Sequence, residues 1–224
     1  ALQLNVAPTA IAQVGERPYL LVERYDRQKS SKQRLHQEDF CQALGVPPET
    51  KYQNEGGPDL LQSFALLRRA TRPSAPQVLQ LLDAVIFNAL IGNHDAHGKN
   101  FSLLYTPRGA VLAPLYDLLA TAVYPRLTDK MAMKIGSKYR FTELQTPHWE
   151  RFAVEAGLSP AQVKKRVLHI AQRLPTLAQT QWVAWQAQGY SHPVLGRIVE
   201  LVAQRCGLTV HRLAASEQSD KNSR

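Results

Sequence analysis

The sequence predicts an α+β fold that is mostly α-helical, and three observations point to this class. Several long stretches carry apolar residues at helical spacing, with capping signals at their ends. Residues 19–22 form a short β-prone run after a turn that contains Gly and Pro. Residues 101–105 and 110–113 are two further β-prone runs that flank a Thr-Pro-Arg-Gly turn, as in a β-hairpin.

The N-terminal part combines one expected strand with a basic loop. Residues 1–12 are apolar with no capping residue before them, as in a helix or strand entered in mid-course, so we expect sequence upstream. Residues 19–22 are the expected strand, and the basic, polar residues 27–34 are typical of a solvated loop. A short helix is expected over residues 36–44, ended by Gly45.

The middle of the chain contains an apolar helix that leads into a polar loop. Gly56-Gly57-Pro58 closes a loop before a helix expected over residues 59–70. Pro76 fits the first turn of the next helix, which is apolar on nearly all sides and should lie centrally in the core. It leads into residues 92–100, which consist almost entirely of Gly, Asn, His, Asp and Lys. Such a concentration of polar residues after a buried helix is unusual.

The remainder is expected to be helical apart from one basic segment. Residues 126–140 hold five basic residues and one acid, and we expect a loop or a short strand. Residues 159–162 (Ser-Pro-Ala-Gln) have the form of a capping box at the start of a helix. A last helix is expected over residues 193–206, ended by Gly207, and residues 216–224 are expected to form a polar, frayed tail.

Composition and charge exclude several classes of protein. The 224 residues include 27 Lys plus Arg and 18 Asp plus Glu, a formal net charge of +9, which excludes an acidic tail protein and favours anionic partners. Cys41 and Cys206 are too few for a disulfide framework or a Cys-based zinc site, and are expected to be reduced core residues. We expect one or two domains, no membrane span, no signal peptide and a cytoplasmic location.

Asp95 and Asn100 give the first indication of chemistry. Their Asp-x-x-x-x-Asn spacing is that of the protein-kinase catalytic loop, where the Asp accepts the substrate hydroxyl proton and the Asn binds magnesium. On this motif alone, an Asp/Asn-rich turn that caps its own backbone is an equal alternative. The hairpin favours the kinase interpretation, because it folds the chain back and can bring Asp117 beside Asn100.

His94, His97 and Lys99 admit more than one interpretation. The two histidines could ligate a metal, but no third soft ligand lies nearby in the sequence, which argues against a zinc site. One His could instead order the loop through backbone hydrogen bonds or contact a nucleotide directly. Lys99 is a candidate for contacting the γ-phosphate or Asp95, although a loop lysine is more often solvated.

Several catalytic patterns are missing from these 224 residues. We find no Gly-x-Gly-x-x-Gly loop, no Walker motif and no evident strand lysine paired with a helix glutamate. If the chain is a kinase, we expect its lower lobe and hinge without the lobe that covers the phosphates. Ser63 and Ser102 lack a nucleophile elbow, and Cys41 sits in an apolar context where thiols are inert, so hydrolase chemistry has no support.

Several separate blocks of sequence resemble the HipA family of toxin serine/threonine kinases, and they occur in the family's order. The blocks are residues 21–27, 35–42, 51–52, 56–58, 92–103, 112–117, 133–136 and 139–141. The resemblance covers nearly the whole chain and is most specific over residues 20–117. It implies a protein-kinase-like C-terminal lobe with a hinge strand and a short β-hairpin that carries the metal site.

The resemblance also implies roles for individual residues. Asp95 would be the catalytic base, and Asn100 and Asp117 would bind magnesium. The implied ATP contacts are the backbone of Glu23 and Tyr25 to adenine, Asp26 to ribose, and Gln37, His97 and Tyr116 to the nucleotide. Tyr25 replaces the commoner Phe of the family and keeps an aromatic ring in the hinge.

One departure from the family pattern lies upstream. Family members carry an N-terminal subdomain, a phosphate loop with an autophosphorylated regulatory serine, and an ATP-contacting lysine before the position aligned to Ala1. We therefore expect a C-terminal fragment or a truncated gene product, without the parts that clamp ATP. Residues 1–27 would end the N-lobe and form the hinge strand, residues 28–215 would form the C-terminal kinase lobe, and residues 216–224 the tail.

The implied activity is ATP- and Mg²⁺-dependent phosphorylation of a protein Ser or Thr hydroxyl in a toxin–antitoxin system that produces persistence. Characterised family substrates include an aminoacyl-tRNA synthetase. The implied partner is a HipB-like helix-turn-helix antitoxin, which would connect the chain indirectly to operator DNA.

Two other functions stay open. The first is a catalytically silent module that docks an antitoxin or a DNA-bound partner, and the second is a phosphotransferase acting on a small molecule. The basic residues 126–140 lie where an activation segment would follow Asp117, but a solvated basic face is the commoner explanation of such a run.

Overall fold

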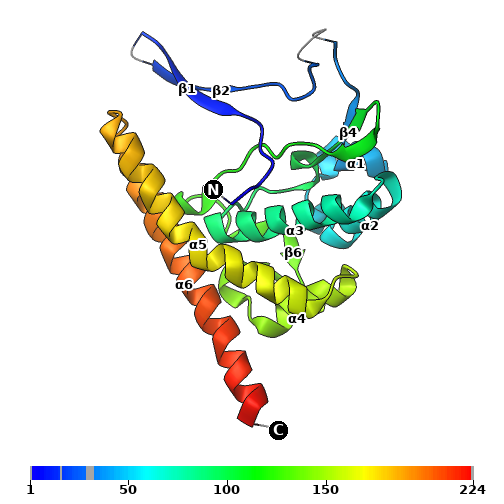
Figure 1. The fold of residues 1–224 in the computed structure, drawn as a ribbon, viewed down its shortest axis with the longest axis vertical. Helices are drawn as coiled ribbons and strands as arrows, with labels where there is room; N and C mark the ends of the chain where they lie inside the picture. The colour runs from blue at the N-terminus through cyan, green and yellow to red at the C-terminus, as the bar shows by residue number, and fades with distance from the viewer. Residues whose placement is uncertain (1, 16, 29–32, 223–224) are drawn as a thin grey trace.

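The computed structural model describes residues 2–15, 17–28 and 33–222, with side chains as far as residue 215. The α-helices form the larger part of it (Figure 1). They are α1 (Phe40–Leu44), α2 (Leu60–Ala70), α3 (Ser74–Ile91), α4 (Thr146–Glu155), α5 (Pro160–Ala187) and α6 (Pro193–Asn222). The predicted mixed and mainly helical class is confirmed.

The strands of the described residues form three small antiparallel sheets. They pair as β1 (Thr9–Val14) with β2 (Arg17–Val22), β3 (Gln37–Asp39) with β4 (Ser102–Thr106) and β5 (Gly109–Leu112), and β6 (Lys130–Ile135) with β7 (Lys138–Arg140). The part of the chain that the structure describes also contains five short 3₁₀ turns: η1 (Pro48–Thr50), η2 (Gln53–Glu55), η3 (Gly98–Asn100), η4 (Thr121–Val123) and η5 (Phe141–Glu143).

Helix α3 lies at the centre of the core, as its apolar sequence predicted. Leu81, Ile86 and Leu90 have no exposed surface, and the helix packs against α2, α5 and α6. By length and composition alone α3 could cross a membrane, with a mean hydropathy of 1.4 over 18 residues. Its place in the protein core accounts for this composition.

The β1–β2 hairpin projects from the helical body at the top of Figure 1. Gly15 stands between the two strands with a φ of 58°, as the predicted turn requires. The segment before β1 contacts the residues that follow β5, where the backbone N–H of Ala7 donates to the carbonyl of Leu115 at 2.8 Å. The expected basic loop at residues 27–34 lies partly outside the described residues, with a bridge between Arg27 and Arg34 at its ends.

The expected helix over residues 36–44 is shorter than predicted. Residues 37–39 form strand β3 and pair with β4, and the helix begins only at Phe40, with the Asp39 side chain accepting from the backbone N–H of Gln42 at 2.9 Å. Gly45 ends α1 in the left-handed conformation, as predicted. The predicted hairpin is confirmed as β4 and β5.

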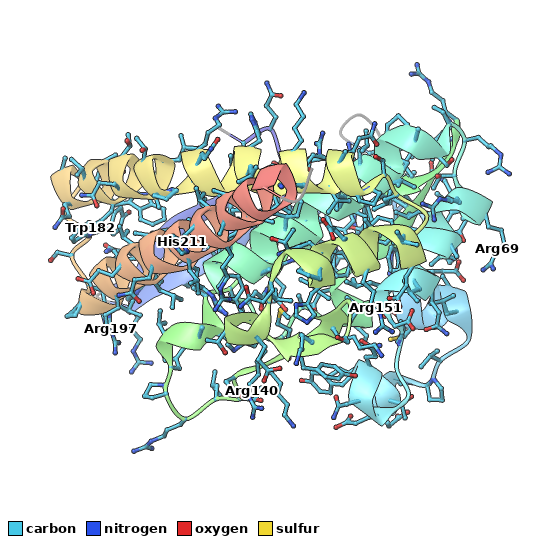
Figure 2. All side chains as sticks on the ribbon, turned by 90° about the horizontal axis from the view of Figure 1, so that it is seen from below. Arg69, Arg140, Arg151, Trp182, Arg197 and His211 are labelled. Atoms are coloured by element: carbon cyan, nitrogen blue, oxygen red, sulfur yellow. The ribbon has the colours of Figure 1, made fainter. Side chains whose placement is uncertain are left out.

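The basic segment at residues 126–140 contains the hairpin of β6 and β7 rather than one loop or strand. Met131, Ala132 and Met133 are buried, while Lys130 and Lys134 on either side of them are exposed. Figure 2 shows Arg69, Arg140, Arg151 and Arg197 projecting from separate parts of the surface. The positive charge is thus distributed over the molecule.

Helices α5 and α6 run side by side as a long pair (Figure 1). Ser159 caps α5 as predicted. Helix α6 does not end at Gly207 but continues through it, so the polar stretch expected as a frayed tail is helical as far as Asn222. Cys41 and Cys206 are free, buried thiols, as expected.

Candidate active site

The loop between α3 and β4 carries Asp95. Gly92 ends α3 with a φ of 76°, and a Cβ atom there would lie 2.7 Å from the Cβ of Ala122, so this close approach requires glycine. The Asn93 side chain donates to Oδ1 of Asn88 at 2.9 Å and to the backbone carbonyl of Asp117 at 3.0 Å. The loop is therefore tied to α3 and to the segment after β5.

Asp95 is held by both its backbone and its side chain. Its N–H donates to Oδ1 of Asn93 at 3.1 Å, and its carbonyl accepts from the N–H of His97 at 2.9 Å. The hydroxyl of Tyr52 donates to Oδ1 of the carboxylate at 2.7 Å. Asp95 is partly exposed, so its carboxylate is open to a reactant.

Asn100 and Asp117 meet at the two ends of the β4–β5 hairpin, as the hairpin predicted. Nδ2 of Asn100 donates to Oδ2 of Asp117 at 2.5 Å. Asp117 has a φ of 56°, a left-handed conformation that non-glycine residues rarely adopt and that is concentrated at functional sites.

The donors of this pair fit magnesium. Mg²⁺ is bound in proteins by one or two carboxylates together with water and substrate phosphates. Asp117 supplies a carboxylate whose Oδ1 accepts no hydrogen bond from the residues described, and Asn100 supplies an amide. Over the same residues there is no cluster of three or more His, Cys, Asp or Glu.

His94 orders the loop rather than facing the candidate site. Its Nδ1 lies 2.8 Å from the carbonyl of Thr128, and its Nε2 lies 3.2 Å from the Arg205 guanidinium. Because a guanidinium can only donate, Nε2 is the acceptor and Nδ1 carries the proton. Burial holds the pKa of His94 below its usual value, so the ring is neutral at pH 7.

His97 is buried beside Asp95. Its ring packs edge-on against Tyr52, with 5.2 Å between ring centroids, and its side chain caps the turn that contains Asn100, whose Oδ1 accepts from the His97 N–H at 3.0 Å. Burial, reinforced by the nearby Lys51 ammonium, lowers the pKa of His97.

Lys99 and Tyr116 are linked to other groups of the site. The Lys99 ammonium lies 3.7 Å from Oδ2 of Asp39, so it pairs with the cap of α1. The Tyr116 hydroxyl donates to the Lys99 carbonyl at 2.6 Å and lies 3.0 Å from the Ser102 hydroxyl. Burial raises the pKa of Tyr116.

A cleft of about 720 Å³ lies between residues 22–26 and residues 115–119. It is lined by six of the residues singled out from the sequence, namely Glu23, Tyr25, Asp26, Gln37, Tyr116 and Asp117. The Tyr25 and Tyr116 rings stack with 6.0 Å between centroids. The contact of Asp117 with Asn100 connects the cleft to the loop that carries Asp95.

Two polar side chains in the cleft, those of Asp26 and Gln37, differ in their hydrogen-bond partners. Oδ2 of Asp26 lies 2.6 Å from the Arg24 guanidinium and 2.8 Å from that of Arg27, and hydrogen bonding to Arg24 lowers the Asp26 pKa to about 2. In contrast, Oε1 of Gln37 is buried and has no partner among the residues described. Asp26 is thus already occupied by arginines, whereas Gln37 has an acceptor to offer.

Tyr52 and Arg205 also contact this loop, although both lie far from it in the sequence. The sequence analysis assigned neither residue a role. Tyr52 appeared only within a resembling block, and Arg205 lies on α6 in an ordinary amphipathic helix. Neither residue has a local signal for its contact, because Asp95 is 43 positions from Tyr52 and His94 is 111 positions from Arg205.

Comparisons with known proteins agree with this geometry. Residues 1–182 match the family of HipA-like C-terminal domains. The putative kinase Y4mE of Sinorhizobium fredii is 52% identical over 173 residues, covering 76% of this chain and 41% of the relative. The serine/threonine-protein kinase toxin HipA of Shewanella oneidensis is 32% identical over 189 residues, covering 78% of this chain and 43% of the relative. The chain thus spans less than half the length of these relatives.

Two solved structures share the fold. A Shewanella oneidensis complex of HipA, HipB and operator DNA matches with a TM-score of 0.83 and 26% identity, covering 96% of this chain and 54% of the solved chain. The Helicobacter pylori proinflammatory kinase CtkA matches with a TM-score of 0.55 and 12% identity, covering 96% and 83%. The second likeness concerns the fold alone.

Proposed function

Because the chain belongs to the family of HipA-like C-terminal domains, we propose that it carries the catalytic centre of an ATP- and Mg²⁺-dependent protein serine/threonine kinase. The contact between Asn100 and Asp117 joins the Asp95 loop to the cleft beside residues 22–26, the proposed hinge, and it is the observation that carries this proposal; we call this cleft the hinge cleft. Residues 1–27 would supply the hinge and residues 28–215 the kinase lobe.

The hinge cleft would hold the nucleotide base. The Glu23 N–H is used by the Pro8 carbonyl at 2.9 Å, whereas the Tyr25 N–H meets no acceptor among the described residues and is free to donate to adenine. Oε1 of Gln37 would accept from the ligand. The ribose would lie near Asp26, whose carboxylate is held by arginines, and the stacked ring of Tyr116 would border the nucleotide.

The Asp95 loop would carry out the transfer. Asp95 accepts the proton of a Ser or Thr hydroxyl while that oxygen bonds to the γ-phosphorus and the bond to the ADP oxygen breaks. When bound, Mg²⁺ held by Asn100 and Asp117 would neutralise phosphate charge. His97, beside Tyr52, would face the phosphates, while Lys99 could do so only after leaving Asp39.

The similarity to a solved complex also supports partners of the toxin–antitoxin type. A solved relative is a complex with HipB and operator DNA, so we propose that this protein binds a HipB-like antitoxin and reaches DNA through it. The substrate would be a cytoplasmic protein, with an aminoacyl-tRNA synthetase as the first to assay. Catalytically silent docking on the antitoxin is the alternative, and it predicts antitoxin binding without any phosphotransfer.

Replacement of Asp95 tests the proposal. In the longest natural form of the protein, Asp95→Asn should lower transfer of labelled γ-phosphate to protein Ser or Thr by at least about a hundredfold. Asp129→Asn, at an exposed carboxylate paired with Arg140, is the matched control and should leave transfer unchanged. Equal phosphotransfer by Asp95→Asn and the wild type would exclude the mechanism.

A further inference from the structure

Tyr52 is the residue whose side chain holds the carboxylate of Asp95. Its hydroxyl donates to Oδ1 at 2.7 Å. Oδ2 of Asp95 accepts no hydrogen bond from the part of the chain that the structure describes. One carboxylate oxygen is therefore held and the other is free to accept a proton.

The ring of Tyr52 is itself held in place. The His97 ring packs against it edge-on with 5.2 Å between centroids, and the Lys51 ammonium lies 5.1 Å from its centroid. Burial, together with the hydrogen bond to Asp95, raises the pKa of Tyr52 to about 12. The hydroxyl thus keeps its proton at neutral pH and acts as a donor.

The backbone around Tyr52 is anchored on both sides. The Gly57 N–H donates to the Tyr52 carbonyl at 2.8 Å, and a Cβ at Gly57 would lie 2.3 Å from the Thr50 carbonyl oxygen, so this turn needs glycine. Oε1 of Gln53 accepts from the backbone N–H of Lys134 in β6 at 2.8 Å. These contacts place the phenol at a fixed point above the Asp95 loop.

We propose that Tyr52 is a positioning residue for phosphoryl transfer, which fixes the rotamer of Asp95 so that Oδ2 meets the incoming hydroxyl and takes its proton. This inference rests on the proposed function, in which Asp95 is the base. Asn93 and His97 already hold the Asp95 backbone, so the Tyr52 hydroxyl removes the remaining freedom of the side chain. Small displacements of a catalytic group lower the rate strongly, which gives this hydrogen bond its importance.

Tyr52→Phe tests the inference, because phenylalanine keeps the ring contact with His97 and removes only the hydroxyl. We expect kcat to fall about tenfold with an unchanged KM for ATP. The loss should fall on kcat alone, because the hydroxyl that is removed holds the Asp95 carboxylate. Tyr124→Phe, at an exposed tyrosine in η4's C-terminal cap, is the matched control and should change neither.

The outcomes separate this inference from the proposed function. If kcat of Tyr52→Phe equals that of the wild type, or if KM for ATP rises as much as kcat falls, Tyr52 does not position Asp95 and the inference is overturned. If Asp95→Asn keeps full phosphotransfer, the proposed function fails first. Thermal unfolding of Tyr52→Phe within a few degrees of the wild type would show that the variant is folded, so a lower kcat then reports on the position of Asp95.

Discussion

Nη2 of Arg205 donates to Nε2 of His94 at 3.2 Å, and this contact joins helix α6 to the loop that carries Asp95. Arg205 is 8% exposed, lies 4.0 Å above the Phe141 ring, and has no carboxylate within ion-pair distance among the residues described. Burial lowers its pKa to about 10. A buried guanidinium of this kind is costly to desolvate, and its specific effect here is to orient the His94 ring.

Replacing Arg205 should separate stability from activity. In Arg205→Met the buried charge is removed and the apolar stem is kept, so the free energy of unfolding should change by less than about 2 kcal/mol in either direction. Phosphotransfer should fall about tenfold, because the loop loses its support from α6. Urea denaturation and a kinase assay measure the two quantities. Arg197→Met, at an exposed position of α6, is the control, and equal activity of both variants would argue against this role.

Stability should decrease below about pH 6.5 because of His94. Burial lowers its folded pKa, while in the unfolded chain the ring titrates near 6.5. As the pH falls below that value, the unfolded chain takes up a proton that the folded protein does not, so the free energy of unfolding falls. In His94→Gln the free energy of unfolding should depend less on pH. The dependence that stays would come from His97, whose pKa is also lowered. Unfolding curves at pH 5, 6 and 7.5 give the slope, and an unaltered slope in the variant would refute the assignment.

Gln37→Leu should weaken nucleotide binding without a loss of stability. Oε1 of Gln37 is buried without a partner, so an apolar replacement of similar size costs little and can stabilise by up to about 1 kcal/mol. Its contact with the nucleotide would be lost, and ATP affinity should fall about tenfold. Calorimetry and thermal unfolding give both values, with Gln204→Leu on exposed α6 surface as the control. A destabilised variant with normal affinity would show that Gln37 is structural.

Asp26 should contribute to stability at neutral pH. Its folded pKa of about 2 lies below the ordinary value of 3.8, so the contribution is present above about pH 4 and is lost as the pH falls toward 2. Because Arg24 and Arg34 are mostly exposed, we expect Asp26→Asn to cost about 1–2 kcal/mol at pH 7. The free energy of unfolding of Asp26→Asn and of the wild type should be measured at pH 7, 5 and 3. The difference between the two proteins should become smaller as the pH falls. A difference that stays constant would mean that the charge is not involved.

The features that sequence predicted well depend on neighbouring residues. Gly45, Asp59 and Ser159 mark helix ends through local backbone geometry, and all three do so in the structure. The meeting of Asn100 and Asp117 followed from a hairpin of two adjacent strands, which is also a short-range feature. Local chemistry was sufficient in each case.

The features that sequence reasoning missed depend on residues far apart in the chain. Residues 37–39 look helical alone, but they form β3 because β4 supplies a partner strand more than 60 residues later. Gly207 costs a helix about 1 kcal/mol, but packing of α6 against α5 continues the helix through it. The contacts of Tyr52 with Asp95 and of Arg205 with His94 belong to the same class.

Titration of Mg-ATP into the protein by calorimetry, with Asp117→Asn as the paired variant, tests the central claim most directly. The substitution keeps the size of the side chain and removes the carboxylate that would hold the metal, so the variant should fold normally. We predict saturable binding by the wild type that requires Mg²⁺, and at least about tenfold weaker binding by Asp117→Asn. Equal, magnesium-independent affinity of the two proteins would contradict a kinase site at Asn100 and Asp117.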